Sequence, residues 1–191
     1  MITVIDNFLD TYDITNILDK VGCDDLSNYQ SFNLYWNPFV SLPTDKGGTL
    51  SNGCFIHNFY RNNETTSEYA WIADIIVDAY LKLDKEIVNE CTSLHHAKFN
   101  LFTGTEKRIS YGFHQDIVHG YIHNSLIFYL DDSDGYTLFD DGSRIRSKTN
   151  RACIITGGHN YKHASTNSTK GIRRNINIVM KEYRENRSNN M

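Results

Sequence analysis

The chain has 191 residues, of which 40% are hydrophobic and 22% charged, as is ordinary for one globular domain with one core. Its formal net charge is −4, whereas proteins that bind nucleic acids or anionic membranes non-specifically are normally basic. The composition therefore disfavours both of these partners.

The N-terminal residues lack the charged and apolar segments of a secretory signal. No apolar run approaches the roughly 20 residues that are needed to cross a bilayer. The four cysteines are far apart in the sequence and form no C-x-x-C pair. These features predict a cytoplasmic protein with reduced cysteines and no membrane partner.

The first 92 residues are predicted to be mainly helical. Residues 2–9 alternate weakly and favour an extended entry strand. Apolar residues at helical spacing follow, with Asp10 or Thr11 able to cap the helix: Ile14, Ile17, Leu18 and Val21. The next segment, 22–63, is rich in Asn, Ser, Gly and aromatic residues and is predicted to be irregular.

A second, longer helix is predicted over 66–90. Thr65 and Glu68 match a capping box, and one apolar stripe follows it: Tyr69, Ile72, Ile76, Tyr80, Leu83 and Ile87. Four aromatic residues precede this helix within segment 31–60, namely Phe32, Tyr35, Trp36 and Phe39. Two hypotheses fit them equally, a cover over a substrate site and packing against the long helix.

After residue 92 the sequence favours strands. Short segments rich in β-branched and aromatic residues recur between turn signals, at 95–102, 110–117, 122–130, 136–139, 152–156 and 174–180. Helices followed by a run of strands indicate an α+β fold that is mainly β, with the strands in a sandwich or jelly roll. We expect one domain over 1–180, with a helical N-terminal region over 1–92, a jelly-roll core over 93–180 and a polar tail over 181–191.

One pair of residues is typical of a metal site. On a strand, residues i and i+2 point to the same face, so His114 and Asp116 converge. A second histidine from a distant strand would complete two imidazoles and one carboxylate on one side of a metal, as in non-haem Fe(II) oxygenases. An H-x-D pair alone is weak evidence, because the chain contains eight histidines.

Four blocks in order make the pattern more specific. They are Tyr111 to Asp116, Ser125 to Asp131, Lys148 to Arg151 ahead of segment 152–156, and His163 to Ser165 ahead of Gly171 to Ile176. Together they resemble the 2-oxoglutarate and Fe(II)-dependent oxygenases, in particular their prolyl-hydroxylase-like branch. The resemblance covers 95–180 well and 1–94 only faintly, and it implies a double-stranded β-helix (jelly roll) core that is buttressed by the N-terminal helices.

The resemblance implies that His114, Asp116 and His163 are the catalytic iron ligands. It also implies that Fe(II), 2-oxoglutarate and O₂ together hydroxylate a substrate, which is a protein or peptide side chain such as proline, or a small molecule. Two other functions remain open at this point. One is a non-oxidative jelly-roll binding module, and the other is a cupin-type metalloenzyme that does not use 2-oxoglutarate. The oligomeric state is not predicted.

The far carboxylate of 2-oxoglutarate needs a cation in a closed pocket. The resemblance assigns this role to Arg173, with Tyr129 donating its hydroxyl and Asn175 as a further helper on the same strand face. Arg174 alternates to the opposite face, so its replacement by Ala is expected to be nearly silent. The alternative is that Arg173 and Arg174 are an exposed pair on an edge strand. The chain departs from the family where a Tyr is common before the H-x-D pair, because Phe99 or Phe102 stands there.

Overall fold

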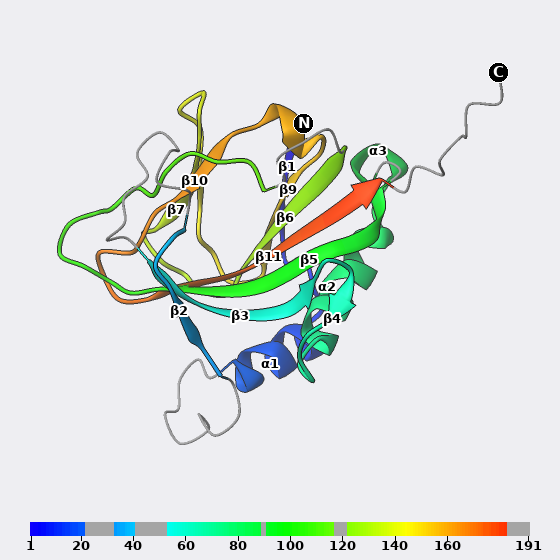
Figure 1. Cartoon of the computed structure of the whole chain (residues 1–191), viewed down its shortest axis with the longest axis horizontal. Coiled ribbons are helices and arrows are strands. Elements are labelled where there is room, and N and C mark those ends of the chain that lie inside the picture. The colour runs from blue at the N-terminus through cyan, green and yellow to red at the C-terminus, as the bar shows by residue number, and fades with distance from the viewer. Residues whose placement is uncertain (22–32, 41–52, 89–90, 117–121, 183–191) are drawn as a thin grey trace.

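The computed structural model describes residues 1–21, 33–40, 53–88, 91–116 and 122–182, and it consists mainly of antiparallel strands (Figure 1). The strands are β1 (Ile2–Asp6), β2 (Tyr35–Asn37), β3 (Cys54–Arg61), β4 (Glu64–Thr65), β5 (Cys91–Phe102), β6 (His123–Tyr129), β7 (Tyr136–Phe139), β8 (Arg144–Arg146), β9 (Arg151–Ile155), β10 (His163–Ser165) and β11 (Arg173–Glu182). The larger sheet has the order β1-β9-β6-β11-β5-β3-β2, with β4 paired to β3. The smaller sheet has the order β10-β7-β8.

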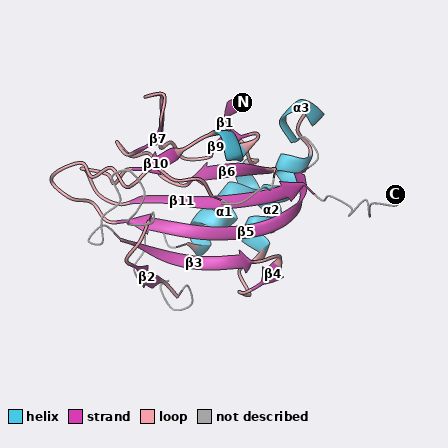
Figure 2. Ribbon diagram, turned by 45° about the horizontal axis from the view of Figure 1, so that its top comes forward, coloured by secondary structure: helices cyan, strands magenta, loops and turns pink. Residues whose placement is uncertain are grey.

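The helices cover the outer face of the larger sheet (Figure 2). They are α1 (Thr11–Lys20), α2 (Trp71–Leu81) and the short α3 (Lys85–Val88). Apolar residues of α1 and α2 form one buried cluster with the outward-facing residues of the sheet: Ile14, Ile17, Ile72, Ile76 and Tyr80 with Phe99, Leu126, Phe128, Ile154, Ile176 and Ile178. Removing this apolar surface from water is the main force that fixes the helices on the sheet.

The inner face of the larger sheet packs toward the smaller sheet. On β6, Leu126 and Phe128 join the core under the helices, whereas Ile127 and Tyr129 pack with Phe139 of β7 in a second buried cluster. The period-2 alternation of strand side chains separates the two environments. The two facing sheets and the outer helices confirm the predicted jelly roll, mainly β, with N-terminal helices that buttress it.

The helix predictions are partly correct. Asp10 caps α1, accepting a hydrogen bond from the backbone N–H of Asp13 at 2.9 Å. The capping box at Thr65 is wrong, because Thr65 lies in β4, where it pairs with Tyr60. Helix α2 begins at Trp71, and the predicted long helix is divided between α2 and α3.

The strand predictions fail where pairing depends on distant partners. Segment 22–63 was predicted to be irregular, yet β2 and β3 lie within it. Segment 110–117 is not a regular strand over its described residues, where Ser110 and His114 make isolated bridges to Thr166 and His163. The short strands β8 and β10 were not predicted.

Among the described residues, no helix is long and apolar enough to span a membrane. Phe32 and residues 183–191 lie outside the described ranges of the chain. The division into a domain over 1–180 and a polar tail therefore stays a prediction.

Candidate metal centre and co-substrate pocket

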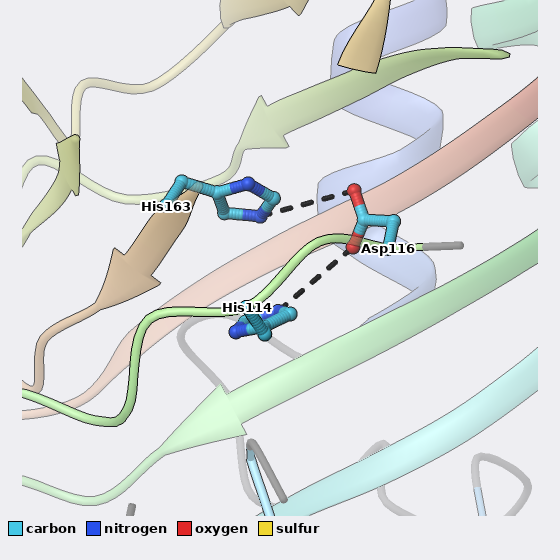
Figure 3. A group of neighbouring side chains, drawn as sticks. All are labelled: His114, Asp116 and His163. Carbon is cyan, nitrogen blue, oxygen red and sulfur yellow. Dashed lines mark ion pairs between the residues drawn. The ribbon is translucent and has the colours of Figure 1, made fainter. Parts of the chain in front are cut away.

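Two imidazoles and one carboxylate converge between the two sheets (Figure 3). His114, Asp116 and His163 each offer one ligand atom, and these atoms all lie within 4.8 Å of one another. The Asp116 carboxylate faces both rings, with Oδ1 3.9 Å from Nε2 of His114 and Oδ2 3.8 Å from Nε2 of His163. The sequence predicted these three residues as ligands, and the structure brings them together.

Backbone pairing explains why residues far apart in sequence meet here. His114 and His163 exchange two backbone hydrogen bonds of 3.0 Å, so their side chains leave the same bridge. Nδ1 of His114 lies 3.1 Å from the carbonyl oxygen of Gly112. When Nδ1–H donates to this carbonyl, the lone pair of Nε2 remains available for a metal.

The Asp116 side chain is buried and held as an anion. Burial by itself would raise its pKa, but the neighbouring His163 and His114, with hydrogen bonds from Ser125 and Asn177, bring that pKa well below its usual range. Nδ2 of Asn177 donates to Oδ1 at 2.9 Å, whereas Oδ2 is buried with no hydrogen-bond partner among the described residues. An unpaired buried carboxylate oxygen is costly, and a cation between the three residues would satisfy it.

His163 is prepared to bind a metal at neutral pH. Its ring is buried, and burial lowers its pKa to about 4 despite the opposing influence of Asp116. Metal ligands must be deprotonated, so a neutral imidazole can coordinate without first losing a proton. Two imidazoles and one carboxylate, with no thiolate, suit a divalent first-row metal such as iron. His114, Asp116 and His163 therefore fit the iron ion that the sequence resemblance implies.

Arg173 is a fully buried cation on the same inner face. Its guanidinium lies between two rings, with Cζ 5.2 Å from the ring centre of Phe102 and 5.5 Å from that of Tyr129. It donates to the carbonyl oxygen of Thr166 at 3.2 Å and to Oγ1 of Thr137 at 3.3 Å. Its Nε–H has no partner, and no described carboxylate hydrogen bonds to it. A buried guanidinium with a free donor fits an anionic ligand.

Tyr129 lies beside Arg173, as predicted for a helper group. Its hydroxyl donates to Oγ1 of Thr137 at 2.8 Å, and the same oxygen accepts from Arg173. Asn175, the other predicted helper, is buried, and its Oδ1 accepts from Nδ2 of Asn100 at 2.9 Å. The roles of Arg173, Tyr129 and Asn175 toward 2-oxoglutarate stay predictions.

A pocket opens from the two histidines along this face. It is lined by Val40, Lys98, Asn100, Phe102, His114, Ile127, His163, Ser165, Asn175 and Asn177. Asn175 and Phe102 line it directly, and Arg173 packs behind Phe102. Of the two residues proposed for the position where the family commonly has Tyr, Phe102 lines this pocket and Phe99 lies in the core under the helices.

Arg174 corrects one expectation. It does alternate to the opposite face from Arg173, but it is buried there and ion-paired to Asp131. Its Nε donates to the Asp131 carboxylate at 3.0 Å, and its backbone N–H donates to the same group at 2.6 Å. Replacing Arg174 would leave Asp131 without its cation and lower stability, so this change is not a silent control for the fold, whereas its effect on 2-oxoglutarate binding stays a prediction. The alternative of an exposed arginine pair is wrong.

Several contributing residues were not predicted from the sequence. Thr137 links Tyr129 to Arg173, and Ser125 is among the groups that lower the pKa of Asp116. No sequence motif marks a lone Thr or Ser for such a role. Lys98 could have been placed beside Asn100 from the sequence. It lies two residues before Asn100 on β5, and strand alternation puts both side chains on the same face.

The predicted cover is only partly described. Tyr35 and Trp36 lie on β2 with 63% and 53% of their surface exposed, and Trp36 packs edge-on against Phe55 of β3. Val40, in the same segment, lines the pocket. Whether this segment covers a substrate stays a prediction.

Comparison with solved structures identifies the architecture. No family model and no curated protein sequence matches the chain. A prolyl hydroxylase from Trichoplax adhaerens, solved with a peptide fragment of the hypoxia inducible factor oxygen degradation domain, matches with a TM-score of 0.64 at 14% identity, over 95% of this chain and 83% of that one. The Pseudomonas putida prolyl-4-hydroxylase matches with a TM-score of 0.61 at 14% identity, over 96% and 92%.

A further similar structure has a broader description. An oxidoreductase of the 2OG-Fe(II) oxygenase family from Burkholderia pseudomallei matches with a TM-score of 0.68 at 9% identity, over 95% of this chain and 86% of that one. The chain thus has the fold of the prolyl-hydroxylase-like 2-oxoglutarate oxygenases. The fold carries over at these identities, whereas the activity has to be argued from the site.

Proposed function

We propose that this chain is an Fe(II)- and 2-oxoglutarate-dependent dioxygenase that hydroxylates a side chain in a peptide or protein. One observation carries the proposal: His114, Asp116 and His163 converge on the same inner sheet face as a fully buried Arg173 that lacks a carboxylate partner among the described residues. A protein that only binds a metal needs the three converging ligands. The buried, unpaired Arg173 additionally fits a co-substrate with a carboxylate far from the metal.

The residues have separate tasks in this proposal. His114, Asp116 and His163 would hold the iron, and Arg173 with Tyr129 would hold the far carboxylate of 2-oxoglutarate. The bound iron and co-substrate would supply the oxidising chemistry with O₂. The chain itself would orient them, hold Asp116 as an anion beside His163 and His114, and enclose the anchor between rings.

A peptide substrate is supported by the fold. The prolyl hydroxylase from Trichoplax adhaerens was solved with a peptide fragment, and this chain shares its architecture over 95% of its own length. The site is also open on the side of Lys98, which is partly exposed. We therefore favour a peptidyl side chain, proline included, over a small molecule.

The test is coupled turnover. The full chain should release succinate from 2-oxoglutarate when Fe(II) and O₂ are supplied, and proline-containing peptides should gain the mass of one oxygen atom. The His114→Ala and His163→Ala variants should not turn over. A binding module would release no succinate, and a cupin-type enzyme would act without 2-oxoglutarate, so either result would replace the proposal.

A further inference from the structure

The stretch of β5 and β11 that pairs from Phe102 to Lys98 carries a cation at each end of its inner face, Arg173 at one and Lys98 at the other. The two strands are in register with Phe102 opposite Arg173, Asn100 opposite Asn175 and Lys98 opposite Asn177. Arg173 is fully buried, whereas Lys98 is only partly buried and lines the pocket with both histidines. The metal ligands lie near the Lys98 end, because Asn177 donates to Asp116.

The Lys98 ammonium has no carboxylate partner among the described residues. The Asp116 carboxylate, which is nearby, accepts from Asn177 and faces the two histidines, and no ion pair joins it to Lys98 among the described residues. Lys98 belongs to the site by geometry, since it lines the same pocket as His114 and His163. Binding surfaces are complementary in charge to their partners, so a pocket lysine without a protein carboxylate favours an anionic ligand.

The charges of the proposed complex leave this lysine in excess. A divalent ion and Asp116 sum to +1, the 2-oxoglutarate dianion brings −2, and Arg173 adds +1. The sum is zero before Lys98 is counted. A second exposed cation, Arg61, stands on β3 directly opposite His96, so positive charge continues from the pocket toward the edge of the sheet.

We propose that Lys98 binds a carboxylate of the primary substrate, namely an acidic residue that flanks the oxidised side chain in a peptide. This inference rests on the proposed function and adds a substrate class to it. The Lys98 ammonium would fix one substrate carboxylate beside the metal, and Arg61 would attract further acidic residues at the rim. A charge-assisted hydrogen bond of this kind selects acidic peptides and weakens as salt is added.

The experiment measures peptide binding rather than turnover. Short fluorescent peptides with one central proline are prepared with Glu or Asp beside it, and again with Gln or Asn in the same places. Their dissociation constants for the full chain are measured by fluorescence anisotropy, without added iron or 2-oxoglutarate. The acidic peptides should bind about tenfold more tightly than the amide peptides, a ratio that corresponds to about 1.4 kcal/mol.

Variants locate the preference at one residue. Lys98→Glu should abolish or reverse it, and Lys98→Arg should retain it. Lys82→Glu is the matched control, because Lys82 is exposed at the end of α2 in the helical layer, and it should retain the preference. Circular dichroism checks that each variant is folded, and Lys98→Gln replaces Lys98→Glu if the latter is not.

The inference is overturned if acidic and amide peptides bind equally, if the preference survives loss of the lysine, or if the wild-type chain binds no acidic peptide. Its failure is separate from that of the proposed function. A chain that releases succinate but shows no acidic preference retains the function and loses the substrate class. A chain that prefers acidic peptides through Lys98 but does not bind 2-oxoglutarate retains the anion site and loses the dioxygenase proposal.

Discussion

At the scale of single residues, Arg173 is the clearest test of the co-substrate pocket. Its neighbours Tyr129 and Thr137 are neutral and cannot replace its charge. Removing one side of a buried charged pair commonly costs about 3–5 kcal/mol. Arg173→Ala should therefore weaken 2-oxoglutarate binding by about two orders of magnitude or more, at about tenfold per 1.4 kcal/mol, as measured by anaerobic calorimetry.

Iron affinity should change little in Arg173→Ala, because the guanidinium is not among the metal-ligating groups. Arg144→Ala is the control, since Arg144 is exposed on β8 and stacks on Tyr136 with Cζ 5.1 Å from the ring centre. Unchanged 2-oxoglutarate affinity in Arg173→Ala would show that the anchor lies elsewhere.

Gly135 makes room for the stem of Arg173. A Cβ at this position would lie 2.5 Å from Cδ of Arg173 and 2.9 Å from the carbonyl oxygen of Asn167, so one of them must shift. Gly135→Ala should displace the guanidinium and weaken 2-oxoglutarate binding by about tenfold, a loss of only about 1.4 kcal/mol. Gly142→Ala is the matched control in the turn between β7 and β8.

At Gly142 a Cβ would meet nothing within 4 Å, although its φ of +87° makes any side chain strained. Gly142→Ala should therefore lower stability but leave 2-oxoglutarate affinity at the wild-type value. Equal 2-oxoglutarate affinities for both alanine variants would remove the steric argument at Gly135.

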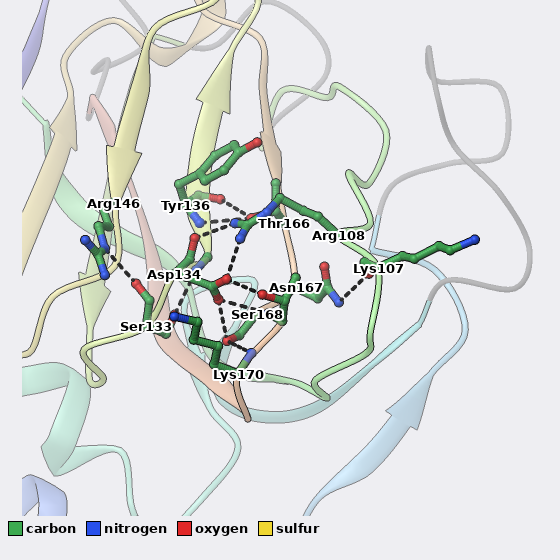
Figure 4. A network of polar contacts seen from close by, with 12 residues as sticks. Lys107, Arg108, Ser133, Asp134, Tyr136, Arg146, Thr166, Asn167, Ser168 and Lys170 are labelled. Atoms are coloured by element: carbon green, nitrogen blue, oxygen red, sulfur yellow. Dashed lines mark hydrogen bonds and ion pairs between the residues drawn. The ribbon is translucent and has the colours of Figure 1, made fainter.

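At the scale of structural elements, Asp134 joins three segments around the pocket (Figure 4). Its carboxylate accepts hydrogen bonds from Arg108 at 2.5 Å, from Ser168 at 2.7 Å and from the backbone N–H of Thr169 at 2.9 Å. It thereby ties the loop after β5 and the loop before β11 to the start of β7. Asp134→Asn should lower the free energy of unfolding by about 1–3 kcal/mol, as measured by denaturant titration.

The same carboxylate should make stability depend on pH. Hydrogen bonds from Thr169 and Ser168 lower the pKa of Asp134 well below its usual range. A carboxyl group with a lowered folded-state pKa stabilises the protein above its unfolded pKa, near 4, and this contribution is lost as the pH falls toward the folded value. Asp134→Asn should flatten this part of the stability profile below about pH 4, and an unchanged profile would contradict the role.

The sequence predicted the elements whose signals are local. The alternation of β6 and β11 placed Tyr129, Arg173 and Asn175 on one face. His114 and Asp116 converge as predicted, although the strand on which that prediction rested is only an isolated bridge. Sequence-based prediction failed for β3 and for the bridge between His114 and His163, because these depend on partners distant in the sequence. It also expected Arg174→Ala to be nearly silent, since alternation gives the face of a residue but not the presence of Asp131 on that face.

At the scale of the whole molecule, metal binding should stabilise the fold. The ligands come from two segments that meet only in the folded chain, so a divalent ion binds the folded state and not the unfolded one. When the free Fe(II) concentration is a hundred times the dissociation constant, the free energy of unfolding rises by about 2.7 kcal/mol. Anaerobic Fe(II) should therefore raise the thermal midpoint by several degrees, and a chelator should reverse this. An equal rise in His163→Ala would indicate binding elsewhere.

The most direct test of the account is an anaerobic titration of the full chain with Fe(II), followed by 2-oxoglutarate. We predict one tightly bound iron per chain, and an added visible absorption when the 2-oxo acid chelates it. His163→Ala should lose the iron, and Arg173→Ala should retain the iron but need far more 2-oxoglutarate. A wild-type chain that binds no iron, or a His163→Ala variant that binds iron and 2-oxoglutarate as the wild type does, would contradict the proposed centre.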